Sequence, residues 1–296
     1  MEKDFDSSLS ADRAPDIEVV PGCSFLKQQR GLSLPTPAEV RALNLLTGDI
    51  RADDWNRPPP VVVESLGLIV KYGGDVTLIE VQTQMMAREQ LKDKVPIPEV
   101  FGWTQEDDQT FIYMELIKGD PLCERWPDMI EDERLAVCDE LRLMVKSWST
   151  LKQDGHDQLI GSLGKKPLNE VLIRDRPNLT GPYMGANALQ QFQDRCRIEI
   201  SVETLIKFTH ADLVPLNILL SRGQNPKVAA VIDWGQAGWY PAYWEYCKAY
   251  RITVGEKHFD KASQEEWHEK YLPHILAPVE KETIYYPWLR FILANI

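Results

Sequence analysis

Several features that would direct a functional assignment are missing from this sequence. No apolar run approaches the ~18 residues that a membrane span needs, and the first 18 residues, MEKDFDSSLSADRAPDIE, lack the basic start and apolar stretch of a secretory signal. The five cysteines are scattered and form no CxxC pair, so neither a zinc site nor a disulfide framework is expected. These absences predict a protein of a reducing, cytoplasmic compartment without a membrane partner.

Positive charge is also scarce. Against 45 Asp and Glu the chain has 33 Lys and Arg, which gives a formal net charge of −12 at pH 7. A nucleic-acid-binding protein normally carries a basic face, so no nucleic-acid partner is expected. The acidity is compatible with a cationic substrate, but it is explained equally well as a means of keeping the protein soluble. Charge alone therefore assigns no function.

The first third of the chain is rich in strand signals. Thr36, Pro37 and Glu39 form a helix start, and residues 77–94 have helical spacing. Strand composition is found in four segments, VVVES, LGLIVKYG, PIPEVFGWT and TFIYMELI.

After Gly119 the sequence pattern changes from strand-rich to mainly helical. Residues 133–152 form the longest predicted helix, and residues 155–185 are expected to form a structured loop. Short strands are expected in IKFT, ILL and VAAV, and mainly helix from Trp244 onward. The prediction is an α+β chain with an N-terminal arm at 1–33, a small strand-rich lobe at 34–117 and a larger, mainly helical lobe at 118–296.

A group of polar residues stands at strand ends. HADLVPLN (210–217) places Asp212 and Asn217 between apolar runs, and Asp233 ends the run VAAVI. Polar side chains there cost stability unless they are paired or bind something. Carboxylate and carboxamide oxygens suit Mg²⁺, and a further carboxylate can take a proton from a hydroxyl. With Lys71 at a strand end and Glu80 on the next helix, these are the parts that phosphoryl transfer uses.

Each of these residues also has a plainer explanation. Asp212 could cap a turn before Pro215, and Asn217 could hold its loop by bonding backbone groups. Lys71 at a strand end would ordinarily be a solvated lysine. Trp234, Trp239 and Trp244 are expected in the core and not in a substrate platform.

Five phrases together resemble one family. They are LPTPAEVRAL, GLIVKYG, VPIPEVFGW, YMELIKGDPL and DWGQAGWYPAYWEY, in addition to HADLVPLN. The chain resembles, from about residue 34 to residue 250, the aminoglycoside phosphotransferase-like family of the protein-kinase-like superfamily, and in particular its fungal branch. The resemblance implies a bilobal protein-kinase-like fold that binds ATP and Mg²⁺ between its lobes.

The resemblance also implies roles for individual residues. Asp212 matches the catalytic base, and Asn217 and Asp233 match the metal ligands. Lys71 matches the lysine that contacts nucleotide phosphates, with Glu80 as its expected partner and Glu89 as the alternative.

Two further matches concern nucleotide binding and loop support. Glu115, Leu116 and Ile117 fall where the family's hinge bonds adenine through its backbone. His210 matches a residue that supports the loop without taking part in chemistry.

The sequence departs from protein kinases and from its own relatives at several points. Ala211 precedes Asp212 where protein kinases carry Arg, and Val214 replaces their Lys, which favours the small-molecule branch. No GxGxxG precedes Lys71. Gln236 stands where fungal relatives commonly have Glu.

The predicted function is ATP-dependent transfer of the γ-phosphoryl group to a hydroxyl of a small molecule. The alternatives are a kinase-fold binding protein without kinase activity, and a biosynthetic enzyme that uses the same cleft for another reaction. The sequence leaves open the acceptor, the choice of ATP or GTP, and the oligomeric state. Acids in the helical regions, such as Asp175, Glu199, Glu245 and Glu256, are candidates to meet amines of an acceptor, but surface solvation explains them equally well.

Overall fold

The computed structural model describes residues 16–31, 33–153, 155 and 158–295. The described chain divides into two compact units. The first contains the described residues up to Val76 together with Phe101–Met114, and the second contains Thr77–Val100 and the described residues from Glu115 onward. The expected N-terminal arm (1–33) lies partly outside the described residues, because these begin at Asp16.

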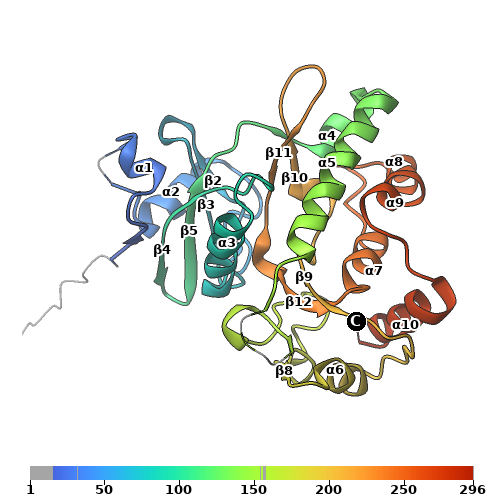
Figure 1. The fold of residues 1–296 in the computed structure, drawn as a ribbon. Helices are drawn as coiled ribbons and strands as arrows, with labels where there is room; N and C mark the ends of the chain where they lie inside the picture. Colours follow the sequence, from blue (N-terminus) through green and yellow to red (C-terminus); the bar gives the residue numbers. More distant parts are fainter. Residues whose placement is uncertain (1–15, 32, 154, 156–157, 296) are drawn as a thin grey trace, which may run out of the picture. The chain divides into compact units, whose positions relative to one another are not determined.

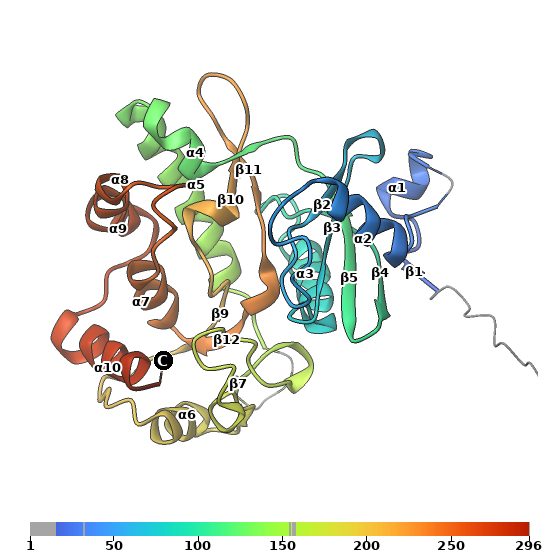
Figure 2. The same cartoon turned by 180° about the vertical axis from the view of Figure 1, so that it is seen from behind.

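The first unit is built on a five-stranded sheet with the order β1-β4-β5-β3-β2 (Figure 2). Its strands are β1 (Glu18–Val19), β2 (Val61–Val63), β3 (Leu68–Gly73), β4 (Val100–Glu106) and β5 (Gln109–Glu115). Two helices, α1 (Ser24–Lys27) and α2 (Pro37–Leu46), precede β2. Because β1 pairs with β4, the described part of the arm from Glu18 to Val19 is a strand of this sheet.

Helix α2 begins where the sequence predicts it. The Thr36 side chain accepts the Glu39 N–H, the Glu39 carboxylate accepts the Thr36 N–H at 2.7 Å, and Pro37 occupies the first turn. This capping box satisfies two backbone donors that a helix end otherwise leaves without partners.

The second unit contains short sheets and most of the helices. The sheets are β11-β10-β6, β12-β9 and β7-β8. Their strands are β6 (Asp120–Pro121), β7 (Leu159–Ile160), β8 (Tyr183–Met184), β9 (Ile206–Thr209), β10 (Ile218–Leu220), β11 (Val228–Val231) and β12 (Gly238–Pro241).

Helix α3 (Leu78–Gln90) belongs to this second unit although it lies between β3 and β4 in the sequence. The other α-helices are α4 (Leu122–Arg125), α5 (Glu131–Ser149), α6 (Ala188–Cys196), α7 (Trp244–Arg251), α8 (Lys261–Glu266), α9 (Leu272–Ile275) and α10 (Tyr286–Asn295). The long helix α5 packs beside β9 and α9 (Figures 1 and 2). Two π-helical turns, η7 (Trp267–Tyr271) and η8 (Lys281–Tyr285), precede α9 and α10.

Each unit has hydrophobic clusters of its own. In the first unit, buried residues such as Val40, Tyr72 and Phe111 form one cluster, which includes side chains of the sheet. The second unit has two: one gathers around Trp126, Trp148 and Trp234, and the other around Phe192 and Trp244. Trp234, Trp239 and Trp244 are all buried, as the sequence predicts.

The predicted fold class is confirmed: the smaller N-terminal unit is sheet-rich and the larger C-terminal unit is mainly helical. None of the helices in the described part of the chain combines the length and the apolar character that a membrane span requires.

Candidate active site

The segment 210–217, called here the 210–217 loop, joins β9 to β10. Its start is fixed by β9, which forms an antiparallel ladder with β12 and pairs Thr209 with Gly238. Its end is fixed by the 3-10 turn η5 (Pro215–Asn217) and by β10, which pairs with β11. Asp233 follows β11 by two residues. Both predicted acids therefore leave strands of the same unit.

The backbone at the start of the loop is held by Glu245, a buried residue on α7. One carboxylate oxygen accepts the His210 N–H at 2.8 Å, and the other accepts the Ala211 N–H at 2.9 Å. Ala211 has a φ of 61°, a left-handed conformation that costs energy for a residue with a side chain. We infer that the paired bonds to Glu245 hold this turn and so direct the next residue, Asp212.

Burial raises the pKa of Glu245 to about 7, while the two backbone donors and the Lys248 ammonium act in the opposite direction. Neither explanation that the sequence offered for Glu245, an acceptor amine or surface solvation, fits its position, because the residue is buried and both of its oxygens are bonded to the backbone inside the unit.

His210 is fully buried and braces the loop. Its Nε2 lies 3.0 Å from the carbonyl oxygen of Ile232, and its Nδ1 lies 3.2 Å from the backbone nitrogen of Asp212. The ring satisfies both contacts only as the neutral tautomer, in which Nε2–H donates to the carbonyl and Nδ1 accepts. Burial lowers the pKa of His210 in spite of the nearby Asp212 and Asp233, which is consistent with a neutral ring.

Asp212 and Asn217 are in direct contact. The Asn217 amide nitrogen donates to the Asp212 carbonyl at 2.9 Å and to Asp212 Oδ2 at 3.0 Å. Asp212 is half-buried, so its carboxylate is partly accessible, whereas Asn217 is buried. Because both amide protons of Asn217 point to Asp212, its Oδ1 is the atom left to act as a ligand.

Asp233 lies at a tight turn next to Glu80. Asp233 has a φ of 64°, and η6 (Trp234–Gln236) follows it. A Cβ placed on Gly235 would lie 2.8 Å from Glu80 Oε2 and 3.4 Å from Asp233 Oδ1. A side chain at this position would have to displace the Glu80 carboxylate, whereas its contact with Asp233 would be an ordinary one. Glycine at 235 therefore lets α3 pack closely against this turn.

Glu80 and Glu89 have different surroundings. Both are on α3, but Glu80 is 3% exposed and lies against Gly235, whereas Glu89 is exposed near the end of the helix. A buried carboxylate costs stability unless it is paired, and Glu80 is the buried one of the two.

Behind Asp233 lies a buried network that the sequence did not indicate. The Lys248 ammonium contacts Glu170 Oε1 and Gln236 Oε1, each at 2.6 Å. Glu170 also accepts from the Trp244 indole at 2.9 Å, and Gln236 Oε1 accepts the Val171 N–H at 3.0 Å. Gln236, three residues after Asp233, is thus fixed by a lysine on α7 and by the segment before the 3-10 turn η4 (Pro177–Leu179).

The surroundings of Gln236 explain why a neutral side chain suits position 236. One carbonyl oxygen already receives the Lys248 ammonium and a backbone N–H, and Lys248 is neutralised by Glu170. A second carboxylate at 236 would change the balance of charge in this buried group.

The residues predicted to bind nucleotide are on other elements of the chain. Lys71 is on β3 of the first unit and is half-buried. Glu115 ends β5, and Leu116 and Ile117 follow it without regular secondary structure. The Glu115 N–H donates to the Glu99 carbonyl at 2.8 Å, so its own donor is already used. A base bound here would have to use the Glu115 carbonyl or the groups of Leu116 and Ile117.

A hard divalent cation would find oxygen donors at Asn217 and Asp233. No group of three or more His, Cys, Asp and Glu side chains suited to a metal occurs among the residues the structure describes. A cation that kept several waters and bound phosphate oxygens would need only one or two protein carboxylates. The available donors fit Mg²⁺ better than a metal that needs a closed cage of side chains.

Sequence reasoning missed Glu170 and Lys248 and did not foresee that Glu245 binds the backbone of the 210–217 loop. Two signals pointed toward them: Glu245 and Lys248 stand in an otherwise apolar and aromatic helix, WEYCKAY, and charged residues are seldom fully buried unless they are paired. The partners themselves are far away in sequence, so no short-range pattern identifies them.

Comparison with known proteins places the chain in a family. The sequence profile of the phosphotransferase enzyme family (APH) matches residues 79–280, more than half of the chain. None of the curated proteins matches it.

Similar solved structures include an aminoglycoside-3'-phosphotransferase of type VIII, 18% identical, with a TM-score of 0.47 and coverage of 76% of this chain and 84% of that one. The apo form of a thermostable mutant of aminoglycoside phosphotransferase APH(4)-Ia is 17% identical, with a TM-score of 0.49 and coverage of 80% and 79%. APH(3'')-Id from Streptomyces rimosus is 15% identical, with a TM-score of 0.48 and coverage of 84% and 98%. On the family match, the predicted relationship is confirmed, and this chain belongs to the phosphotransferase enzyme family.

Proposed function

We propose that the protein transfers the γ-phosphoryl group of ATP to a hydroxyl of a small molecule, with Asp212 as the group that accepts the hydroxyl proton. The observation that carries the proposal is the contact between Asp212 and Asn217, made on a loop whose backbone is held by Glu245 and His210. A base that is fixed by its neighbours but partly accessible is suited to orient and deprotonate an acceptor.

In the proposed reaction the acceptor O–H bond breaks and its proton passes to the Asp212 carboxylate. The acceptor oxygen forms a bond to the γ-phosphorus, the bond from that phosphorus to the bridging oxygen breaks, and ADP leaves. Asn217 holds one carboxylate oxygen through its amide nitrogen at 3.0 Å. It thereby limits the rotation of Asp212 and leaves Oδ1 of the carboxylate to face the acceptor.

Asn217 Oδ1 and the Asp233 carboxylate are the proposed ligands of Mg²⁺. When bound, Mg²⁺ neutralises charge on the nucleotide phosphates. Within the second unit, Asn217 is tied to the Asp233 strand end, because its carbonyl accepts the Ile232 N–H at 2.9 Å. This bond supports the assignment of both residues to one metal.

The nucleotide-binding roles rest on the sequence resemblance. Lys71 is proposed to contact the phosphates, Glu80 to act as its partner, and Glu115, Leu116 and Ile117 to meet the base. Use of ATP instead of GTP, the fungal branch and a cytoplasmic location stay predictions, and a small-molecule acceptor is the proposed partner.

The proposal is tested with Asp212→Asn. An acceptor is first found by following ADP release over a panel of hydroxyl compounds. We expect the rate of phosphoryl transfer to that acceptor to fall by at least about 100-fold, since a positioned general base contributes a factor of roughly 10²–10⁴ to the rate. Mg-ATP binding, measured by calorimetry, should survive. Asp233→Asn should instead weaken Mg-dependent ATP binding.

Asp139→Asn is the matched control, because the Asp139 side chain on α5 is 65% exposed, and this variant should leave turnover unchanged. Equal turnover by Asp212→Asn would contradict the role of Asp212. No thermal response of the wild-type protein to ATP, ADP or GTP with Mg²⁺ would favour a binding protein without kinase activity. Product formed without nucleotide consumption would favour the biosynthetic alternative.

A further inference from the structure

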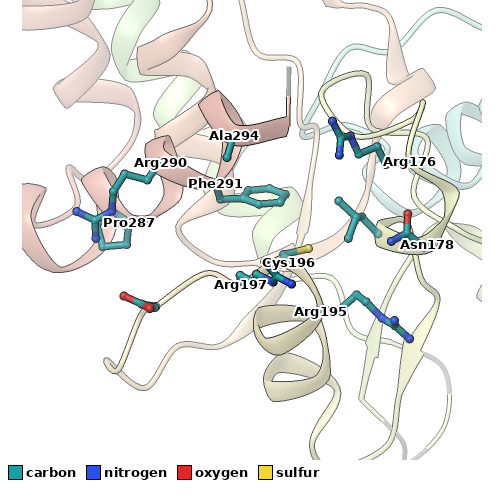
Figure 3. Close-up of a pocket in the computed structure, with 11 residues that line it drawn as sticks. Arg176, Asn178, Arg195, Cys196, Arg197, Pro287, Arg290, Phe291 and Ala294 are labelled. Atoms are coloured by element: carbon teal, nitrogen blue, oxygen red, sulfur yellow. The ribbon is translucent and has the colours of Figure 1, made fainter.

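A pocket of about 580 Å³ opens in the second unit (Figure 3), and Glu199, a candidate to meet acceptor amines, is one of the residues that line it. Three elements supply its wall: the 3-10 turn η4 (Pro177–Leu179) with the residue before it, the C-terminal end of α6 with the residues that follow, and α10. No residue of the 210–217 loop, and neither Glu80 nor Asp233, lines it. It is a separate candidate site.

The lining of this pocket is strongly basic. It contains four arginines, Arg176, Arg195, Arg197 and Arg290, and a single acid, Glu199. The whole chain has a net charge of −12, so this local excess runs against the charge of the rest. Within the part of the chain that the structure describes, the four arginines form no ion pair, and neither does Glu199. Unpaired like charges repel one another, and an anion would remove that repulsion.

The helix dipole accounts for the positions of only two of the four arginines. Arg195 and Arg197 lie at the C-terminal end of α6, where cations are favoured by the helix dipole. Arg176 precedes η4 and Arg290 lies on α10, so neither owes its position to the end of α6. Three separate elements contribute guanidinium groups to one pocket, which a single helix end does not account for.

Arg197 occupies a backbone position that ordinarily selects glycine. It is the C-cap of α6 with φ 55° and ψ 41°, the left-handed region, and the Ile198 N–H closes the turn on the Gln193 carbonyl at 2.9 Å. Glycine would adopt this conformation without strain. A strained residue held by its surroundings is a reason to look for a role of its side chain.

The inner part of the pocket is apolar. Leu179, Cys196 and Phe291 are buried, whereas the four arginines are exposed. Figure 3 shows the Phe291 ring in the middle of the group with the labelled arginines around it. Burial raises the pKa of the Cys196 thiol to about 12, so this sulfur behaves as an apolar group and not as a thiolate. The pocket therefore joins guanidinium donors to an apolar wall.

We propose that this pocket binds an anionic small molecule, one that carries a phosphate or carboxylate group on an apolar body. Guanidinium groups bind both kinds of anion through paired N–H donors, which lysine cannot do. Phe291 and Leu179 bury the apolar body. The pocket shares no residue with the proposed catalytic, metal-binding and nucleotide-binding set.

The test is calorimetry on the full chain at low salt with four probes: phenyl phosphate, benzoate, inorganic phosphate and acetate. We expect one site for phenyl phosphate or benzoate, and the stronger of the two identifies the anion. Inorganic phosphate and acetate, which lack the ring, should bind more weakly. The double variant Arg197→Ala/Arg290→Ala should weaken binding at least tenfold.

Arg142→Ala is the matched control, because Arg142 is an exposed arginine on α5 outside the pocket. It should bind the probes as the wild type does, and so should Asp212→Asn. Equal losses in Arg142→Ala and in the double variant would show general charge attraction and overturn the proposal. Loss of binding in Asp212→Asn would place the probe in the candidate active site and overturn it too, as would the absence of binding by all four probes. Arg176→Ala, on a third element, serves as a second variant if the double variant does not fold.

Discussion

At the scale of single residues, Glu245 exists in two states with different consequences for the 210–217 loop. As a carboxylate it accepts both the His210 and the Ala211 N–H. As a protonated acid it keeps only one good acceptor for these two donors, because the other oxygen carries hydrogen. The pKa of about 7 places this change near neutral pH. The geometry before Asp212 therefore depends on a buried titration.

The stability that belongs to Glu245 should fall as pH rises. In the unfolded chain the carboxyl titrates near 4.5, whereas in the fold burial raises its pKa to about 7. Between these values the folded protein holds a proton that the unfolded chain has lost, so the contribution is complete below about pH 4.5 and is lost as pH rises through 7. In urea unfolding, we expect the free energy of unfolding of the wild type minus that of Glu245→Gln to drop by on the order of 2 kcal/mol between pH 5 and pH 8.

Taking the difference between wild type and variant removes the titration of all other groups, which the two proteins share. A difference that stays constant with pH would show that Glu245 has an ordinary pKa in the fold. A difference that rises with pH would show that the two backbone donors outweigh burial.

At the scale of elements, the ion pair of Lys248 and Glu170 joins α7 to the segment before η4. Their side chains are 2% and 0% exposed. Removing one partner leaves the other charge buried, which costs roughly 3–5 kcal/mol. We expect Lys248→Met to destabilise the protein by this amount in urea unfolding, and Lys248→Met/Glu170→Gln to recover a large part of it, since the double variant buries no unpaired charge.

The matched control for this pair is Lys261→Met on α8. Lys261 and Glu265 form an exposed i,i+4 pair, and such pairs contribute about 0.3–0.5 kcal/mol. If Lys248→Met were as mild as Lys261→Met, the buried pair would contribute nothing to the stability of α7.

Elements specified by neighbouring residues were predictable, and contacts across the chain were not. The start of α2 follows from Thr36, Pro37 and Glu39, which touch within one turn. Strands β2 to β5 follow from short β-rich runs broken by turn residues. By contrast, Glu245 is 35 residues from His210, and Lys248 is 78 residues from Glu170. Such pairings depend on how α7 packs, and no local pattern carries that information.

The same distinction applies to the candidate site. The spacing of Asp212 and Asn217 on one loop suggested that they act together, and the structure places them in hydrogen-bond contact. Their assigned roles still rest on the resemblance. The resemblance gave His210 a supporting role, but the sequence could not supply its partner, the Ile232 carbonyl, or the lysine that fixes Gln236. These are consequences of tertiary packing.

At the scale of the whole molecule, the hydrophobic clusters are separate. The cluster of the first unit contains Phe111, whose ring stacks on Tyr72 at 4.9 Å between centroids. A cluster of the second unit contains Phe192, whose ring meets Trp244 edge-on at 5.7 Å. Both phenylalanines are fully buried. Cutting either ring back to alanine should therefore remove about 3–5 kcal/mol from its own cluster.

Because proteins open in cooperative units, we expect each of these substitutions to act mainly within its own unit. In hydrogen-exchange mass spectrometry, Phe111→Ala should speed exchange in β3 and β5 while α7 keeps its protection. Phe192→Ala should do the reverse, with faster exchange in α6 and α7 and unchanged exchange in β3. Each variant is thus the matched control of the other. Faster exchange in both units from either variant would mean that the chain opens as one cooperative body, and the division into two cores would then have no energetic counterpart.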